Sequence, residues 1–292
     1  MKRLILWTLL LTSFPASVNA QPDITIENCK ESLSYLASDE LEGRGSGTAG
    51  NRKAAEFISE KFKSYGLETT LQPFRYSQIV RLWLFGRRRM VVETSNVVGI
   101  LKGATDRHIV IGAHFDHLGI KRGKIYNGAD DNASGTTGLL ELAEALAAPK
   151  IIRDYTIVFI AFSGEELGLL GSQHYVNNPV FPLSKCDLMI NLDMVGRLRG
   201  TTLTAQGGNL SRSQRALVHK LDDDYPFTVR ITAAGNRSDH APFNWRGVPV
   251  LFFHTGTHPQ YHEPTDDEHL INYEGLVQIS KFTLDLTRKM IE

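Results

Sequence analysis

Carboxylate and imidazole side chains follow directly after four apolar segments of this 292-residue sequence. They are His114 and Asp116, then Glu165 and Glu166, then Asp193, and finally His254, His258 and His262. Such groups are ordinary nitrogen and oxygen ligands of zinc, and burying them unpaired would be costly. A further acidic pair, Asp130-Asp131, could supply a carboxylate that bridges two metal ions about 3.5–4 Å apart. The pattern therefore predicts a metal centre.

The adjacent acids Glu165 and Glu166 suit water activation at such a centre. Neighbouring residues in a turn can point one carboxylate at a metal ion and the other at the water that the ion binds. Coordination lowers the pKa of that water toward neutrality, so a nearby glutamate can take its proton and pass it to a leaving group. Asp116 lies two residues after His114 on an extended segment, where it could accept the second N–H of the imidazole.

The apolar segments are expected to be strands of one sheet, at Ile109–Ala113, Thr156–Phe162, Leu188–Leu192 and Val248–Phe253. Helices are expected at 134–147, 167–177, 211–222 and 269–290. Alternating strands and helices indicate an α/β fold with a largely parallel sheet. Open sheets of this kind bind ligands beyond the carboxyl ends of their strands, which is where the acids and histidines fall.

The residues before the first of these strands predict helices and then a hairpin. The pattern is helical over 28–67, apart from a glycine-rich stretch at 42–50. This stretch contains the dinucleotide-binding pattern Gly-x-Gly-x-x-Gly, but no strand precedes it, so a loop before a helix is expected instead. The hairpin is expected from Leu82–Phe85 and Met90–Val92, with a turn at Gly86 and the solvated residues Arg87, Arg88 and Arg89 beside it.

The first twenty residues have the pattern of a secretory signal peptide. Lys2 and Arg3 precede an apolar run, Leu4–Leu11, that is too short to span a bilayer, and cleavage is expected after Ala20. Gln21 follows, rather than the cysteine of a lipid-anchored protein, so we expect a secreted or periplasmic protein without a membrane anchor. Removing Lys2 and Arg3 from the 32 basic residues leaves 30 against 32 acidic ones, which gives no sign of a nucleic-acid partner.

The mature chain is long enough to form one domain over residues 21–292, since about 270 residues can bury a large core. Only Cys29 and Cys186 are present, too few for a thiolate metal cluster. In an exported protein they could form one disulfide or remain two buried thiols.

In their order along the chain, these motifs resemble those of the co-catalytic di-zinc aminopeptidase family, which includes bacterial leucyl aminopeptidases and relatives of glutamate carboxypeptidase. The resemblance spans nearly all of the mature chain. The motifs that carry it are Leu36 to Arg44, Asn96-Val97-Val98-Gly99, His114-Phe115-Asp116, Gly128-Ala129-Asp130-Asp131-Asn132, Gly164-Glu165-Glu166, Asn191-Leu192-Asp193-Met194, Ser238-Asp239-His240 and Tyr261-His262.

The resemblance implies a pair of zinc ions in each chain, with Asp131 bridging them. The implied ligands are His114, Asp131, Glu166, Asp193 and His262. Glu165 would be the general base, Asp116 the partner of the first histidine, and Tyr261 a hydrogen-bond donor to the tetrahedral intermediate. The implied reaction is hydrolysis of the amino-terminal bond of peptides with a free amino terminus, through a metal-bridging hydroxide.

The fold implied by the resemblance is a three-layer α/β/α sandwich with a mixed, mostly parallel central sheet, as in zinc exopeptidases. Larger members carry a protease-associated domain between the amino-terminal helices and the main sheet. Residues 68–95 are too few to hold one. The chain therefore resembles the compact form, with residues 21–292 as a single zinc peptidase domain.

Several roles stay open at the level of single residues. Asp130 competes with Asp131 for the bridging position, and the residues themselves do not separate the two. His258 and His262 have the spacing of a helical zinc pair, but glycine and prolines nearby predict a loop. His262 is the preferred ligand, and His258 is expected at the rim of the site. The Asp239-His240 pair fits a structural hydrogen bond as well as a site role.

Two other reactions and one inactive alternative also stay open. A carboxypeptidase of the same family would need a cation for the terminal carboxylate, which Arg197, Arg199 or Arg237 could provide. A glutaminyl cyclase shares the fold but uses a single zinc ion, and the Asp130-Asp131 and Tyr261-His262 pairs favour the peptidase. A non-catalytic protein on this fold should have lost ligand residues, and none of the implied ligands is missing.

Overall fold

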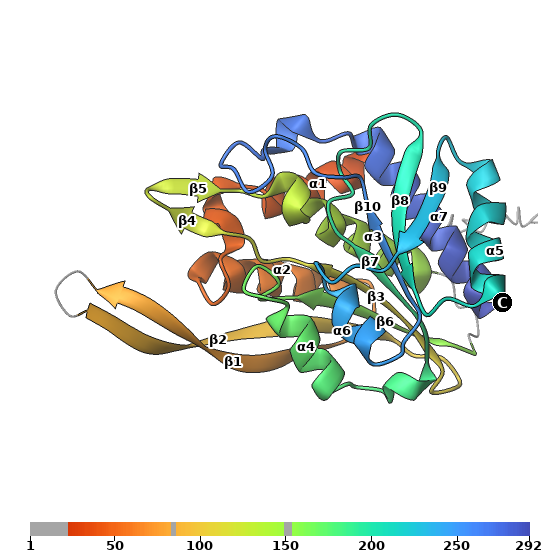
Figure 1. Ribbon diagram of the computed structural model, residues 1–292, viewed down its shortest axis with the longest axis horizontal. Coiled ribbons are helices and arrows are strands. Elements are labelled where there is room, and N and C mark those ends of the chain that lie inside the picture. Colours follow the sequence, from red (N-terminus) through yellow and green to blue (C-terminus); the bar gives the residue numbers. More distant parts are fainter. Residues whose placement is uncertain (1–22, 83–85, 149–153) are drawn as a thin grey trace, which may run out of the picture.

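A computed structural model describes residues 23–82, 86–148 and 154–292 of the chain. An eight-stranded sheet crosses the molecule in the order β1-β2-β6-β3-β7-β10-β8-β9 (Figure 1). Its strands are β1 (Glu68–Leu82), β2 (Gly86–Leu101), β3 (His108–His114), β6 (Thr156–Phe162), β7 (Cys186–Leu192), β8 (Thr202–Gly208), β9 (Thr228–Ala233) and β10 (Val250–His254). A small separate sheet pairs β4 (Gly119–Lys121) with β5 (Lys124–Tyr126).

The centre of the large sheet is parallel, with β6, β3, β7 and β10 side by side. Every residue of β3 and β6 is buried. Strands covered on both faces favour continuous apolar runs, which is why these segments were recognisable in the sequence. All four predicted strands are present, shifted by at most two residues at their ends.

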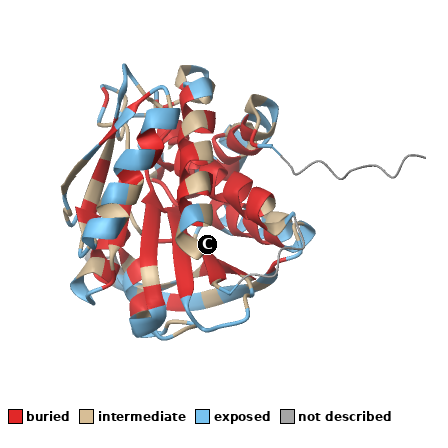
Figure 2. Ribbon diagram, turned by 90° about the vertical axis from the view of Figure 1, so that its right-hand side faces the viewer, coloured by how far each residue is buried: buried red, intermediate tan, exposed pale blue. Residues whose placement is uncertain are grey.

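Helices cover both faces of the sheet (Figure 1), and the packed side chains form one apolar core on each side. The helices on one face are α1 (Ile26–Leu36), α2 (Ala49–Ser64), α3 (Gly135–Ala147), α5 (Arg212–Leu221) and α7 (Tyr273–Ile291). Those on the other face are α4 (Leu170–Asn177) and α6 (His240–Trp245). Figure 2 shows buried residues along the strands and exposed ones on the outer sides of helices. The predicted three-layer α/β/α sandwich with a mixed, mostly parallel sheet is confirmed.

The hairpin of β1 and β2 projects from the body of the protein (Figure 1). Its antiparallel register runs without interruption from Glu68 opposite Ile100 to Leu82 opposite Gly86. The predicted turn at Gly86 is therefore wrong, because this glycine already pairs as the first residue of β2. Arg87, Arg88 and Arg89 belong to the same strand, while residues 83–85, predicted as part of a strand, lie outside the described residues.

The predicted signal peptide, residues 1–20, also lies outside the described residues. Within the described part of the chain, no helix is long and apolar enough to cross a membrane. Export therefore stays a prediction from the sequence.

The two cysteines are free and buried. Cys29, within α1, packs in the core on one face of the sheet, and Cys186 packs in the core on the other face. Burial raises the pKa of the Cys186 thiol to about 12. Of the two possibilities that the sequence left open, the structure has two buried thiols.

Candidate metal centre

The loops at the carboxyl ends of the parallel strands bring the five predicted ligands together. The carboxylate of Asp131 lies at their centre, and its two oxygens face different histidines. Its Oδ1 lies 3.4 Å from His114 Nε2, and its Oδ2 lies 3.1 Å from His262 Nε2. A carboxylate with an imidazole nitrogen beside each oxygen has the arrangement of a group that bridges two cations.

On one side of Asp131, a buried group of His114, Asp131 and Asp193 could hold a metal ion. His114 Nε2 lies 3.4 Å from an oxygen of each acid. The other ring nitrogen, Nδ1, lies 3.1 Å from the backbone carbonyl of Asp116 and must donate to it. In the neutral ring Nε2 then carries the lone pair, which is the form that binds metal.

Asp116 is the partner of this histidine, as predicted, but through its backbone oxygen. The Asp116 carboxylate lies further away, at 3.8 Å from His114 Nδ1. The Asp116 carboxylate instead accepts hydrogen bonds from the Ser46 hydroxyl at 2.8 Å and the Glu165 N–H at 3.1 Å. It therefore fixes the backbone at the residue predicted to be the base.

On the other side of Asp131, a second group contains His117 and Glu166. His117 Nδ1 lies 2.7 Å from Glu166 Oε1 and 3.8 Å from Asp131 Oδ2. His262 Nε2 approaches the other oxygen of Glu166, at 3.3 Å. The sequence reasoning missed His117, although its position three residues after His114 in a loop of the site was a usable signal.

These short approaches lack the geometry of hydrogen bonds. Both ring nitrogens of His117 and the Oε1 atom of Glu166 are buried without a hydrogen-bond partner in the described structure. Ligand atoms that sit about 2.0–2.2 Å from one zinc ion lie roughly 3–3.5 Å from each other. The imidazole nitrogens of His114 and His262 lie at such separations, 3.1–3.4 Å, from carboxylate oxygens of the cluster, and this set of nitrogen and oxygen donors fits zinc as the shared partner.

The charges of the buried acids are also perturbed as expected for a site that needs cations. Burial would raise the pKa of Glu166, but His117 and His262 hold this pKa well below its ordinary value. The nearby carboxylates of Asp131 and Glu166 in turn raise the pKa of His262 to about 10. A positive charge on His262 would balance the acids here, and bound metal ions would replace that charge.

Asp193 and Glu165 share the site, but their pKa values are shifted in opposite directions. Burial would raise the pKa of Asp193, but His114 and the Ser238 hydroxyl, at 2.6 Å, hold it below its ordinary value. Burial raises the pKa of Glu165 well above its ordinary value, and Asp193 adds to this effect. An ionised ligand beside a carboxyl group that can hold a proton is the division of roles that acid–base catalysis needs.

Asp130 and His258 lie next to the cluster but point away from it. His258 Nε2 lies 3.1 Å from Asp130 Oδ2, and the Gly196 N–H donates to the other oxygen of Asp130 at 2.7 Å. Asp266 accepts the backbone N–H groups of both Asp130 and Asp131 at 3.0 Å and so fixes this turn. The expectation that His258 lines the rim is wrong, because its pairing with Asp130 buries it.

Tyr261 and the Asp239-His240 pair flank the cluster. Tyr261 is 40% exposed, and its ring stacks on His262 with centroids 3.9 Å apart, so it lies at the surface beside the cluster. His240 donates to the carbonyl of Gly235 at 3.1 Å and stacks on Phe252. Burial raises the pKa of Asp239 to about 7.

Arg44 is a second residue that the sequence reasoning did not single out. Its guanidinium is fully buried and donates to the carbonyl oxygens of Leu36, Phe115, Asn127 and Gly128. It thereby joins the end of α1 to the loops that carry the first histidine and the bridging aspartate. The position of Arg44 in the glycine-rich motif was visible in the sequence, but its burial was not.

A cavity of about 350 Å³ opens beside the cluster. Its lining includes metal-site residues together with Met194, Gln206, Arg237, Phe252, His254 and Tyr261. Of the three arginines proposed for a terminal carboxylate, only Arg237 lines it. Arg197 donates to the Gln260 side chain and Arg199 to the Thr257 carbonyl.

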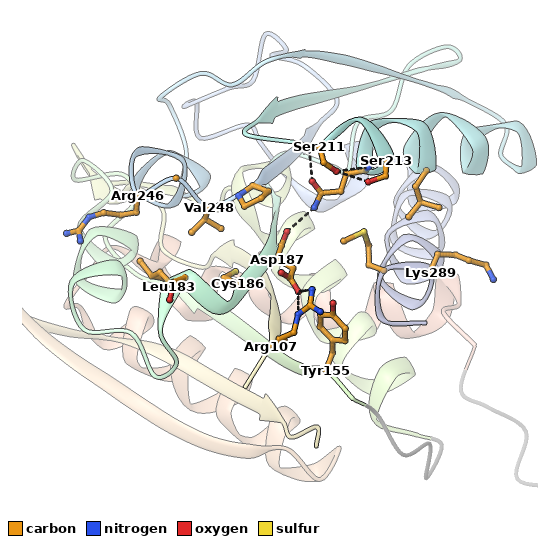
Figure 3. Close-up of a pocket in the computed structure, with 16 residues that line it drawn as sticks. Arg107, Tyr155, Leu183, Cys186, Asp187, Ser211, Ser213, Arg246, Val248 and Lys289 are labelled. Atoms are coloured by element: carbon orange, nitrogen blue, oxygen red, sulfur yellow. Dashed lines mark hydrogen bonds and ion pairs between the residues drawn. The ribbon is translucent and has the colours of Figure 1, made fainter. Parts of the chain in front are cut away.

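A larger cavity, of about 600 Å³, lies at the opposite edge of the sheet (Figure 3). Cys186 at the start of β7 and Val248, just before β10, line it, so it adjoins the amino ends of the strands. Arg107 within it pairs with Asp187 at 2.9 Å. It contains none of the predicted ligands, so the smaller cavity is the candidate active site.

A three-layer fold with buried histidines and carboxylates at the carboxyl ends of parallel strands defines a metal-dependent hydrolase of the zinc exopeptidase type. Residues 96–287 match the family described as peptidase family M28. Because this match covers more than half of the chain, the protein belongs to peptidase family M28. The resemblance inferred from the sequence motifs is thereby confirmed.

Individual relatives agree with this assignment. The chain is 35% identical over 202 residues to aminopeptidase YwaD of Bacillus subtilis, an alignment that covers 63% of this chain and 42% of that protein. The chain thus spans less than half the length of this curated relative.

Solved structures show the same fold. An aminopeptidase from Aneurinibacillus sp. strain AM-1 aligns with a TM-score of 0.80 and 19% identity, over 91% of this chain and 94% of that one. The glutaminyl cyclase of Porphyromonas gingivalis aligns with a TM-score of 0.72 and 18% identity, over 92% of this chain and 100% of that one. The fold alone therefore does not choose between these two reactions.

Proposed function

We propose that this protein is an aminopeptidase that binds two zinc ions and hydrolyses the amino-terminal bond of peptides with a free amino terminus. The observation that carries the proposal is the central position of Asp131, with a histidine nitrogen facing each of its oxygens. Membership of peptidase family M28 supports the reaction class.

The donor set divides into two sites that share one carboxylate. His114 and Asp193 would hold one zinc ion, Glu166 and His262 the other, and Asp131 both. When bound, the zinc pair would acidify water and polarise the scissile carbonyl.

Glu165 is the residue of this chain that moves the proton. Its carboxylate would take a proton from the attacking water, hold it because burial favours its neutral form, and give it to the departing nitrogen. The hydrogen bond from its N–H to Asp116 keeps the residue in place. Tyr261 lines the cavity, and its hydroxyl would donate to the oxygen that gains negative charge.

One alternative reaction has an observation in its favour. Arg237 lines the cavity and could hold the terminal carboxylate of a carboxypeptidase substrate. A single-zinc cyclase is less well supported, because it would leave one side of Asp131 without a cation.

The test measures zinc per chain and hydrolysis of free and amino-blocked peptides, with and without a chelator. We expect two zinc ions, cleavage of free peptides only, and loss of activity on chelation. Glu165→Gln should keep both ions and lose about 10²–10⁴-fold in kcat, the usual contribution of a general base. Glu60→Gln, at an exposed position on α2, is the control. Cleavage of blocked peptides would exclude the aminopeptidase assignment.

A further inference from the structure

Two polar side chains share one face of the cavity beside the metal centre. On β10, Phe252 and His254 are two residues apart and therefore point to the same side of the sheet. Gln206 on the neighbouring strand β8 lies directly opposite Phe252. All three line the cavity that also contains Glu165.

The hydrogen bonds around Gln206 and His254 fix both as donors toward this space. Gln206 Oε1 accepts the Gly235 N–H at 2.8 Å, so its amide nitrogen is turned toward the histidine. His254 Nδ1 accepts the Gly256 N–H at 3.2 Å, so the proton of the neutral ring is on Nε2. The two donor nitrogens face each other at 3.4 Å.

Two donors cannot satisfy each other, so this pair needs an acceptor from outside the chain. The ring of His254 stacks on Phe252 with centroids 5.0 Å apart, and Phe252 in turn stacks on His240 at 4.7 Å, so this row of packed rings limits the rotation of His254. The polar arrangement is thus held rigidly by packed rings.

A cation faces the same space. Arg237 lines the cavity and has no ion pair with any residue in the described part of the chain. A cavity with two oriented N–H donors and an unpaired guanidinium, walled by Phe252 and Met194, is complementary to a carboxylate on a short apolar stem.

We propose that the donor pocket, defined as Gln206, Arg237 and His254, binds a carboxylate of the substrate. In the proposed aminopeptidase, on which this inference rests, that group is the side chain of an amino-terminal glutamate or aspartate. A carboxylate could also come from the carboxyl terminus of the substrate, so the experiment has to separate these two sources.

The kinetic test uses zinc-loaded enzyme and dipeptide amides that lack a terminal carboxylate. We expect kcat/KM for Glu-Ala amide to exceed that for Leu-Ala amide by about tenfold or more, as one charge-assisted hydrogen-bond pair provides. Arg237→Gln should reduce this ratio at least severalfold, whereas Arg212→Gln, at an exposed position on α5, should leave it unchanged. Equal or faster cleavage of the leucine substrate by the wild type overturns the side-chain assignment.

A binding test decides the pocket even if no peptide is hydrolysed. Calorimetry compares glutamic acid α-amide with leucinamide, and N-acetylleucine with its amide, on the zinc-loaded protein. Tighter binding of the first compound in the first pair supports a side-chain carboxylate. If only N-acetylleucine binds more tightly than its amide, the pocket binds a carboxylate, but this carboxylate is the carboxyl terminus of the substrate. That result supports the pocket and contradicts the proposed aminopeptidase. No preference in either pair, or preferences that Arg237→Gln leaves intact, overturns the proposal.

Discussion

Replacing Arg44 by methionine tests how the metal-binding loops are held. The buried guanidinium donates to four backbone carbonyls, those of Leu36, Phe115, Asn127 and Gly128. Methionine keeps an unbranched apolar side chain but removes every donor and the charge. The loops that carry the first histidine and the bridging aspartate would then lose their common attachment.

The expected loss of stability follows from these contacts. The Gly128 oxygen keeps a second donor, the Ala133 N–H, so three carbonyls are left to count. A buried acceptor without its partner costs about 1–3 kcal/mol, which gives a gross loss of roughly 3–9 kcal/mol. Burial lowers the pKa of Arg44 to about 10, so part of the loss is offset when the poorly solvated charge is removed. We expect a net loss of about 3–5 kcal/mol, the usual result of breaking a buried charged network.

The assay is thermal unfolding of the chelated protein, followed by circular dichroism. A domain of this size loses roughly 2–4 °C in Tm per kcal/mol, so Arg44→Met should lower Tm by about 10 °C. Arg44→Lys keeps the charge but not the fork of donors, and should fall in between. Arg52→Met is the matched control, because the Arg52 side chain is exposed and makes a single bond, to the Gly47 carbonyl. A fall of less than about 3 °C for Arg44→Met would refute the reasoning.

Three further predictions concern the metal site and the core. His117→Ala should weaken zinc binding by about 10–100-fold in a chelator competition, because His117 supports Glu166. His219→Ala, at an exposed histidine, is the control. Equal zinc affinities of His117→Ala and the wild type would contradict this supporting role of His117. Chelation should lower Tm, because a ligand at a thousand times its Kd stabilises by about 4 kcal/mol, and an unchanged Tm would argue against bound metal. Burial raises the pKa of Glu141 from 4.5 to about 8. The folded protein is therefore fully stable with respect to this group below pH 4.5, where Glu141 is neutral in both the folded and the unfolded state, and it loses stability as the pH rises from 4.5 through 8. Glu141→Gln should therefore gain stability over the wild type as the pH rises from 4.5 to about 8, by up to about 1.4 kcal/mol per pH unit in urea unfolding, and a gain that shrinks with pH would contradict this.

The strands and the position of the site could be predicted because both produce a recognisable pattern within a few consecutive residues. Strands β3 and β6 are buried on both faces, so each is an unbroken apolar run in which the first polar residue marks the end. Acids and histidines placed there converge because the strands are parallel. The β1–β2 hairpin is not covered in this way, and its turn was misplaced because a glycine can pair in a strand as well as bend a chain.

Residues whose role depends on distant contacts could not be found in this way. His117 follows a strand like other histidines in the sequence, and only the approach of Glu166, from the loop after β6, gives it a place in the site. Arginine is a residue type usually found at the surface, yet Arg44 is buried among four carbonyls from three separate segments of the chain. Such contacts join residues up to 84 positions apart, and the periodic pattern of apolar residues within one helix or strand cannot predict them.

The two choices that the sequence left open, between the adjacent aspartates and between the two loop histidines, turn out to be a single choice. Asp130 faces His258 at 3.1 Å, and Asp131 faces His262 at the same distance. The pairs have identical residue types, so composition cannot distinguish them. What differs is the direction of each carboxylate, which the turn at 130–131 sets. Asp266, 135 or 136 residues away, accepts both backbone N–H groups and so holds the turn from which the two carboxylates diverge.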